Sequence, residues 1–198
     1  MMKKIFNSFL FLIFTLTITS NAFSISPDAF VQSTVDRASD VLSKNILRKE
    51  KINQLKIIAK ETVDIQGIGF YSLGSIRKQL DDSQKDTYSN LFENYFLKSF
   101  ASRLAEYTNP EIEVKNSDIL NKNYTIVHSV LVGTSERPEV KIDWRVYTKH
   151  TDKPLIRDLI IEGLSLARTQ KEEFYSILST NDGDINALFV ALKNFSNN

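Results

Sequence analysis

The apolar residues of this chain repeat with two different periods. Up to about residue 107 they recur at helical spacing, whereas between residues 111 and 161 they alternate with polar residues. A period of 3.6 predicts amphipathic helices, and a period of 2 predicts strands with one solvated face. Helices, then consecutive strands, then two short helices are typical of an α+β domain. We therefore predict an antiparallel sheet whose apolar face is covered by helices.

Local signals place the ends of several helices. Ser26 before Pro27 is a helix start, and Asp81 with Gln84 three residues later resembles a capping box. Asn109, followed by proline, stops the longest helix. The predicted helices begin at Pro27 and continue at about residues 51–63, 83–107, 168–178 and 184–195.

Large apolar residues gather in the longest helix and in the glycine-punctuated segment before it. The helix carries a wide aromatic stripe, which on its own favours an ordinary core. The stripe comprises Tyr88, Leu91, Phe92, Tyr95, Phe96, Phe100, Leu104 and Tyr107, and the preceding segment contains Ile68, Phe70, Tyr71 and Leu73.

The segment 140–148 has the clearest strand signal. Its apolar residues face one way, and Lys141, Asp143 and Arg145 face the other. The apolar set is Val140, Ile142, Trp144 and Val146. Further strands are predicted at 111–117, at 124–132, where Ile126 and Val130 share a face with His128, and at 155–161, which contains Ile160.

The N-terminus predicts a cleaved signal peptide over residues 1–24. Lys3 and Lys4 form a basic start, an apolar run follows, and small residues at 20–24 suit cleavage near residues 22–24. A membrane anchor is the alternative. The apolar run of about 14 residues is shorter than the roughly 20 that a spanning helix needs. We therefore expect an exported chain whose residues 25–198 form a single domain.

The amino-acid composition excludes several classes of functional site. The chain has no cysteine, which excludes disulfides, thiolate metal sites and a cysteine nucleophile. Without the signal peptide, two lysines are lost and the net charge falls from +1 to −1. No basic stripe remains for nucleic acid, and no basic cluster is apparent that would grip a phosphate group.

An enzyme is the main alternative to a binding protein. Ser165 lies in a Gly-x-Ser-x-Ala sequence between a strand and a helix, which is the context of a nucleophile elbow. No histidine follows Ser165, so a turn or N-cap serine is favoured. His128 with Asp158 or Glu162 could supply acid–base chemistry on a cone-shaped α+β scaffold. A satisfied histidine and a structural ion pair or turn cap are the simpler interpretations.

Metal and cofactor signals are weak. The two histidines, His128 and His150, lack the spacing of a zinc site, and we expect His150 to be solvated. The glycines at 67, 69 and 74 lack the dinucleotide-binding spacing. We therefore expect no metal, no cofactor and no catalytic residue.

Several short motifs occur in an order that resembles one known family. The motifs are Asp64, Leu73-Gly74, the helix from Ser83, Trp144-Arg-Val-Tyr147, Ile161-Glu-Gly-Leu-Ser165, Phe174 and Gly183-Asp-Ile-Asn-Ala-Leu188. Their order over nearly the whole mature chain is similar to that of the MlaC, or toluene-tolerance, family of periplasmic phospholipid-binding proteins. The resemblance implies a curved sheet that encloses an apolar cavity.

The resemblance also implies a function. A carrier of this family shuttles a diacyl phospholipid, as cargo, between an outer-membrane lipoprotein–porin complex and an inner-membrane ABC transporter with an MCE-type subunit, which maintains outer-membrane lipid asymmetry. A protein-binding adaptor without lipid is a third possibility. The residues predicted to bind lipid are Phe70, Leu73, Phe96, Phe100, Leu104, Ile126, Val130, Ile142, Trp144, Val146 and Ile160.

Overall fold

The structure is a computed structural model that describes residues 24–135, 137–150 and 152–197. The predicted signal peptide therefore lies, apart from Ser24, outside the described residues. Of the helices in these ranges, none combines the length and the apolar character that a membrane span requires.

The element order confirms the α+β prediction. Helices come first, antiparallel strands follow, and two helices end the described chain. The elements are α1 (Pro27–Ser43), α2 (Arg48–Thr62), α3 (Ile65–Ser72), the 3-10 helix η1 (Gly74–Lys78), α4 (Asp82–Leu104), β1 (Ile112–Asn121), β2 (Tyr124–Leu131), β3 (Val140–Tyr147), β4 (Leu155–Ile161), β5 (Leu164–Ser165), α5 (Leu166–Thr180) and α6 (Ile185–Asn197).

Both predicted helix starts are confirmed by cap geometry. The Ser26 hydroxyl accepts a hydrogen bond from the backbone N–H of Ala29 at 3.4 Å. Asp81 accepts one from the Gln84 backbone N–H at 2.8 Å, and the Gln84 side chain accepts one from the Asp81 N–H at 3.1 Å. This reciprocal pair satisfies two N–H groups that a helix start leaves free, so α4 begins at a fixed place.

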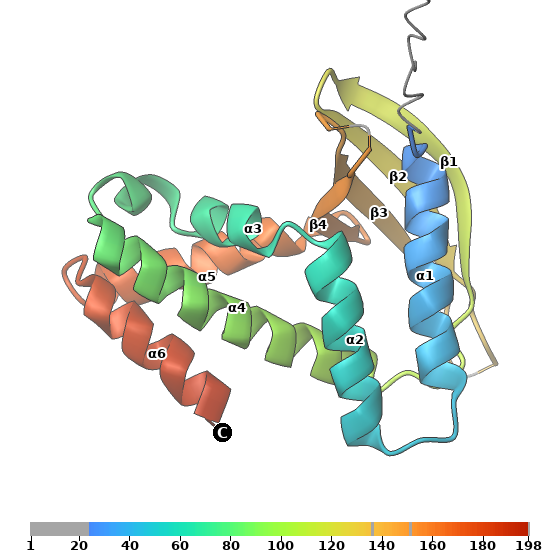
Figure 1. Cartoon of the computed structure of the whole chain (residues 1–198), viewed down its shortest axis with the longest axis horizontal. Coiled ribbons are helices and arrows are strands. Elements are labelled where there is room, and N and C mark those ends of the chain that lie inside the picture. Colours follow the sequence, from blue (N-terminus) through green and yellow to red (C-terminus); the bar gives the residue numbers. More distant parts are fainter. Residues whose placement is uncertain (1–23, 136, 151, 198) are drawn as a thin grey trace, which may run out of the picture.

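The sheet is open and curved. Its five strands pair antiparallel in the order β1-β2-β3-β4-β5. The register shifts twice between β1 and β2, and once between β3 and β4, where Arg157 is the extra residue. Such bulges bend a strand and increase its twist. The curvature gives the sheet a concave face, against which α1 packs (Figure 1).

The helices divide the molecule into two regions (Figure 1). In the sheet region, α1 lies against β1 and β2, and α2 packs against α1 and α4. In the helical region, α3 and α6 pack against the rest of α4, and α5 packs against α3 and α6 and places the Phe174 ring on α4. The long helix α4 therefore belongs to both regions.

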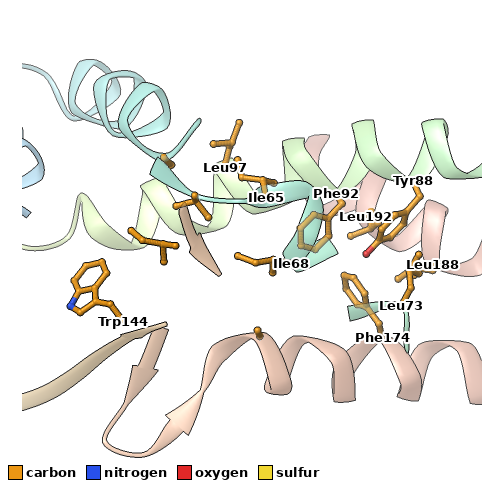
Figure 2. Close-up of a cluster of buried hydrophobic side chains, with 14 of the residues drawn as sticks. Ile65, Ile68, Leu73, Tyr88, Phe92, Leu97, Trp144, Phe174, Leu188 and Leu192 are labelled. Atoms are coloured by element: carbon orange, nitrogen blue, oxygen red, sulfur yellow. The ribbon is translucent and has the colours of Figure 1, made fainter. Parts of the chain in front are cut away.

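The helical region has a close-packed aromatic core. Phe92 is only 1 % exposed and its ring meets those of Tyr88 and Phe174, as Figure 2 shows together with Leu188 and Leu192. The Tyr88 hydroxyl donates to the Gly69 carbonyl at 2.8 Å, and its burial raises the pKa of Tyr88. A Cβ on Gly69 would lie 2.7 Å from the Phe92 ring, so only glycine allows this close approach.

Candidate functional site: an apolar cavity between the sheet and the helices

Two adjoining hollows form a cavity that extends from the sheet region to its junction with the helical region. Their volumes are about 170 Å³ and 280 Å³, and seven residues border both. The first hollow lies between the sheet and α1 and α2, and the second continues towards α5. The shared residues are Val63, Phe100, Arg103, Trp144, Ile156, Leu159 and Leu166.

One wall of the first hollow comes from α1 and α2. These two helices contribute aliphatic side chains along the faces that they turn towards the sheet. The set comprises Val35, Ala38, Leu42, Leu55, Ile58 and Ala59. The helical spacing of Val35, Ala38 and Leu42 is visible in the sequence, where it indicates a buried face but not a hollow one.

The hydroxyl groups in this wall bond to backbone carbonyls. Thr34 donates to the carbonyl of Phe30 at 2.9 Å, and Thr62 donates to that of Ile58 at 2.8 Å. Ser39 donates to Pro110 at 3.1 Å. A buried water needs two to four polar partners. Hydroxyls that already donate to backbone carbonyls offer few hydrogen bonds to such a water. The first hollow is therefore suited to an apolar group.

The opposite wall is the concave face of β3 and β4. Ile142 and Trp144 point to the hollow from β3, and Leu159 and Ile161 do so from β4. The Trp144 indole N–H donates to the Ser129 hydroxyl at 2.8 Å, and Ser129 in turn donates to the Ile142 carbonyl at 2.9 Å. These bonds fix the indole on the sheet, so that its ring forms a rigid part of the wall.

The C-terminal half of α4 lies between the two hollows. Phe96 and Phe100 stack with their ring centroids 5.5 Å apart, and Leu104 and Tyr107 continue the row along the first hollow. The aromatic stripe thus serves two purposes, because Tyr88 lies in the core, Phe92 lies in the core and also meets the second hollow, and the residues from Tyr95 onwards border the cavity.

The second hollow is more polar at its far end. The Tyr95 hydroxyl donates to the Gln170 side-chain oxygen at 2.7 Å, and the Gln170 amide donates to Glu173 at 3.0 Å. Burial, and then the negative charge of Glu173, raise the pKa of Tyr95. Tyr95 therefore stays protonated as a hydrogen-bond donor at neutral pH.

Five of the predicted lipid-binding residues border the cavity. They are Phe96, Phe100, Leu104, Ile142 and Trp144. Leu73 and Val146 are buried in the core, and Phe70 packs against Tyr88. Contact of any of these residues with lipid stays a prediction.

The placement of the remaining three needs correction. Ile126 and Val130 lie on the face of β2 opposite to buried Val127 and Ser129. Ile160 pairs with Asp143 on the corresponding face of β4. None of the three borders either hollow. The inner face of β2 carries Thr125 and Ser129. Because these residues are polar, the sequence pattern does not indicate that this face is buried.

The residues of the enzyme alternative are not brought together. His128 lies on the convex face, where its Nδ1 is 2.8 Å from Asp143 and its Nε2 is 3.1 Å from Asp118. The hydrogen bond with Asp143 is the main cause that raises the pKa of His128. Glu162 accepts a hydrogen bond from the Lys141 backbone N–H. His128 therefore partners neither Asp158 nor Glu162.

Asp158 and Ser165 have structural roles at the start of α5. Asp158 is 2 % exposed and accepts hydrogen bonds from the Ser165 hydroxyl at 2.6 Å and the Ala167 N–H at 3.0 Å. Arg145 lies 3.5 Å from the same carboxylate. Ser165 is the N-cap of α5, as predicted, because it accepts from the Arg168 N–H at 3.1 Å. No group of three or more potential metal ligands exists among the described residues.

Comparisons with known proteins agree with this geometry. A solved structure of a phospholipid-binding protein from Ralstonia solanacearum, in complex with a phospholipid, is similar in fold. Its TM-score is 0.74 at 21 % identity, and the match covers 87 % of this chain and 97 % of that one. No curated protein sequence matches. The family described as MlaC protein matches residues 32–194, and the chain therefore belongs to the MlaC family.

Proposed function

We propose that this protein binds a diacyl phospholipid in the cavity and carries it through the periplasm. The cargo would pass between an outer-membrane lipoprotein–porin complex and an inner-membrane ABC transporter with an MCE-type subunit, which maintains lipid asymmetry of the outer membrane. The observation that supports this most directly is the cavity itself, an apolar hollow in a chain of the MlaC family. The predicted signal peptide agrees with export to the periplasm.

The energetics of a carrier match an apolar wall. Two acyl chains contain roughly 30 methylenes, and exposing them to water would cost up to about 24 kcal/mol at ~0.8 kcal/mol each. A bilayer provides nearly the same environment as the cavity. A carrier therefore needs only to match the free energy that the acyl chains have in the membrane. A wall whose hydroxyls are satisfied by the protein provides this apolar environment without holding the cargo too tightly.

Loading requires the cavity to expand. The two hollows, at about 170 and 280 Å³, together reach only the lower part of the roughly 300–1,000 Å³ of small-molecule sites. Two full acyl chains need more room than this. We infer that α1 and α2 move away from the sheet when lipid enters, because these helices form the wall opposite β3 and β4.

The carrier is favoured over the enzyme because of where the titratable groups lie. His128 is on the convex face, away from the cavity, and the carboxylate of Asp158 is occupied by the α5 cap. We therefore expect no bond to be made or broken in the cargo. The His128→Ala and Glu162→Gln variants should leave lipid transfer between vesicles roughly intact.

Lipid content of the exported protein tests the proposal. After purification from a Gram-negative periplasm, organic extraction and mass spectrometry should yield about one diacyl phospholipid per chain, with mixed headgroups. A protein without lipid, a single headgroup species or a ligand without acyl tails would contradict the proposal.

A matched pair of variants locates the site. Ala38→Trp places a large ring in the first hollow and should lower the bound lipid strongly. Ala187→Trp makes the same change on a half-buried face of α6 that borders neither hollow, and it should retain lipid. Equal lipid content in both folded variants would move the site elsewhere.

A further inference from the structure

Among the described residues, no carboxylate forms an ion pair with Arg103. Of the eight arginines in the chain, six make a side-chain ion pair, hydrogen bond or ring contact in the structure. Arg37, Arg48, Arg145 and Arg157 pair with carboxylates, Arg77 donates to a carbonyl, and Arg137 lies over the ring of Tyr107. Within the described ranges, the side chains of Arg103 and Arg168 make no ion pair or hydrogen bond.

Only one of these two arginines borders the cavity. Arg103 lines both hollows and is the charged residue of the first one, whereas Arg168 lines neither. Both residues are exposed. A cation in the last turn of α4 also interacts favourably with the helix dipole. The dipole accounts for a basic residue there, but not for its place at the rim of an apolar cavity.

We propose that Arg103 binds the phosphodiester of the cargo lipid, an inference that rests on the proposed function. With the acyl chains among the apolar walls, the glycerol and phosphate must lie near the rim, where the guanidinium stands. Its planar fork suits two phosphate oxygens at once. Every diacyl phospholipid carries this group, so one arginine at the rim accepts mixed headgroups while it disfavours diacyl lipids that lack phosphate.

Competition between lipids with identical tails tests this inference. The mature protein is incubated with vesicles that contain dioleoyl phosphatidylethanolamine, dioleoyl phosphatidylglycerol and a minor fraction of dioleoylglycerol, and its bound lipids are quantified by mass spectrometry. The wild type should enrich both phospholipids over dioleoylglycerol. In Arg103→Gln this enrichment should fall about two- to fivefold for both phospholipids, as expected for an exposed ion pair.

Two control variants make the result specific. Arg168→Gln removes the other unpaired arginine and should keep the wild-type enrichment. Arg103→Lys keeps the charge without the planar fork and should fall between wild type and Arg103→Gln. Thermal unfolding confirms that each variant is folded, which the exposure of both positions favours.

Each contrary outcome has a distinct meaning. Unchanged enrichment in Arg103→Gln overturns the inference while the cavity proposal stands. A loss confined to phosphatidylglycerol overturns it because net charge, not the phosphodiester, would then be recognised. Equal losses in Arg103→Gln and Arg168→Gln overturn it in favour of general attraction to the vesicle surface. A wild type that takes no diacyl lipid refutes the proposed function itself.

Discussion

Phe92 and Phe100 lie on the same stripe of α4, yet they have different surroundings. Phe92 is enclosed by the rings of Tyr88, Tyr95, Phe96 and Phe174 and meets the second hollow only. Phe100 stacks on Phe96 alone and borders both hollows. What covers a helix therefore decides whether its apolar face becomes core or cavity wall.

This difference assigns separate tasks to the two regions. Protein interiors are normally close-packed, and the part of the helical region around Tyr88, Phe174 and Leu188, which borders neither hollow, follows that rule. Its buried rings pack on one another away from the first hollow. The sheet region can then keep an imperfectly filled interior, which a stable core elsewhere makes tolerable.

A charge placed on the inner face of β3 should give the largest contrast. Val146 is fully buried and borders neither hollow, whereas Ile142 lines the first hollow. Val146→Glu buries an unpaired charge, which costs several kcal/mol and is comparable with the stability of a whole domain. We expect Val146→Glu to be unfolded and Ile142→Glu to fold cooperatively but without lipid, as read by thermal unfolding and lipid extraction.

The outcome for Ile142→Glu separates cavity from core. If this variant also fails to fold, the space behind Ile142 is close-packed in solution. If it folds and keeps its normal lipid content, the cargo lies elsewhere.

Truncation of the two phenylalanines tests the same contrast with a smaller expected loss of stability. Phe92→Ala should destabilise the protein by about 3–5 kcal/mol, the range for aromatic residues in cores. Phe100→Ala enlarges a cavity that already exists and should cost about 1–2 kcal/mol, within the usual range for single substitutions. Denaturant unfolding of the lipid-free variants measures both values. Equal losses would mean that the two regions are packed alike.

The junction between the regions should show an intermediate effect. Asp158→Asn weakens the link between β4 and the start of α5, since Asp158 binds Ser165, Ala167 and Arg145. A loss of about 1–3 kcal/mol is expected for a buried polar group that loses a partner. Asp143→Asn, on the convex face, is the control and should lose less. Denaturant unfolding at neutral pH compares them.

The convex face should contribute least, through the ionisation of His128. Its hydrogen bonds with Asp143 and Asp118 raise the pKa above the ordinary value of 6.5. The folded state therefore binds the proton more tightly than the unfolded state does. Stabilisation from His128 should be complete below about pH 6.5 and should disappear as the pH rises through the raised pKa.

His128→Gln provides the matching control for this pH dependence. Thermal unfolding between pH 6 and pH 8 should show a small decline for the wild type and a flatter profile for the variant. Parallel profiles would show that His128 does not titrate differently in the folded state.

The sequence predicts several elements well because these have a local cause. Ser26 and Asp81 begin helices through caps that involve only neighbouring residues, and the strict alternation around Trp144 defines β3. These signals do not depend on tertiary contacts. The order of helices and strands was therefore sufficient to predict the α+β fold.

The face of a strand that turns inward is harder to predict. In β2, Ile126 and Val130 are more apolar than Thr125 and Ser129, yet the second pair is buried. Ser129 is accommodated because it bonds to Trp144 and to the carbonyl of Ile142, and both partners come from the next strand. A sequence cannot indicate such a pairing before the register is known.

The hollow itself, and the arginine at its rim, also escape sequence analysis. Val35 and Leu42 show the helical spacing of a buried face whether or not the facing wall fills the space. Arg103 resembles any solvated charge near a helix end. Its special position depends on the curvature of the sheet and on the end of α4, which only the folded chain brings together.

The empty cavity has a consequence for the volume of the molecule. Unfolding eliminates internal voids, so hydrostatic pressure favours the unfolded chain in proportion to the void that the folded state contains. The hollows of about 170 and 280 Å³ lie beside the sheet and reach only as far as Phe92, whereas Tyr88, Phe174 and Leu188 border neither hollow. Compression should therefore loosen the sheet region first. Any molecule that fills the cavity would protect the sheet region from this effect of pressure.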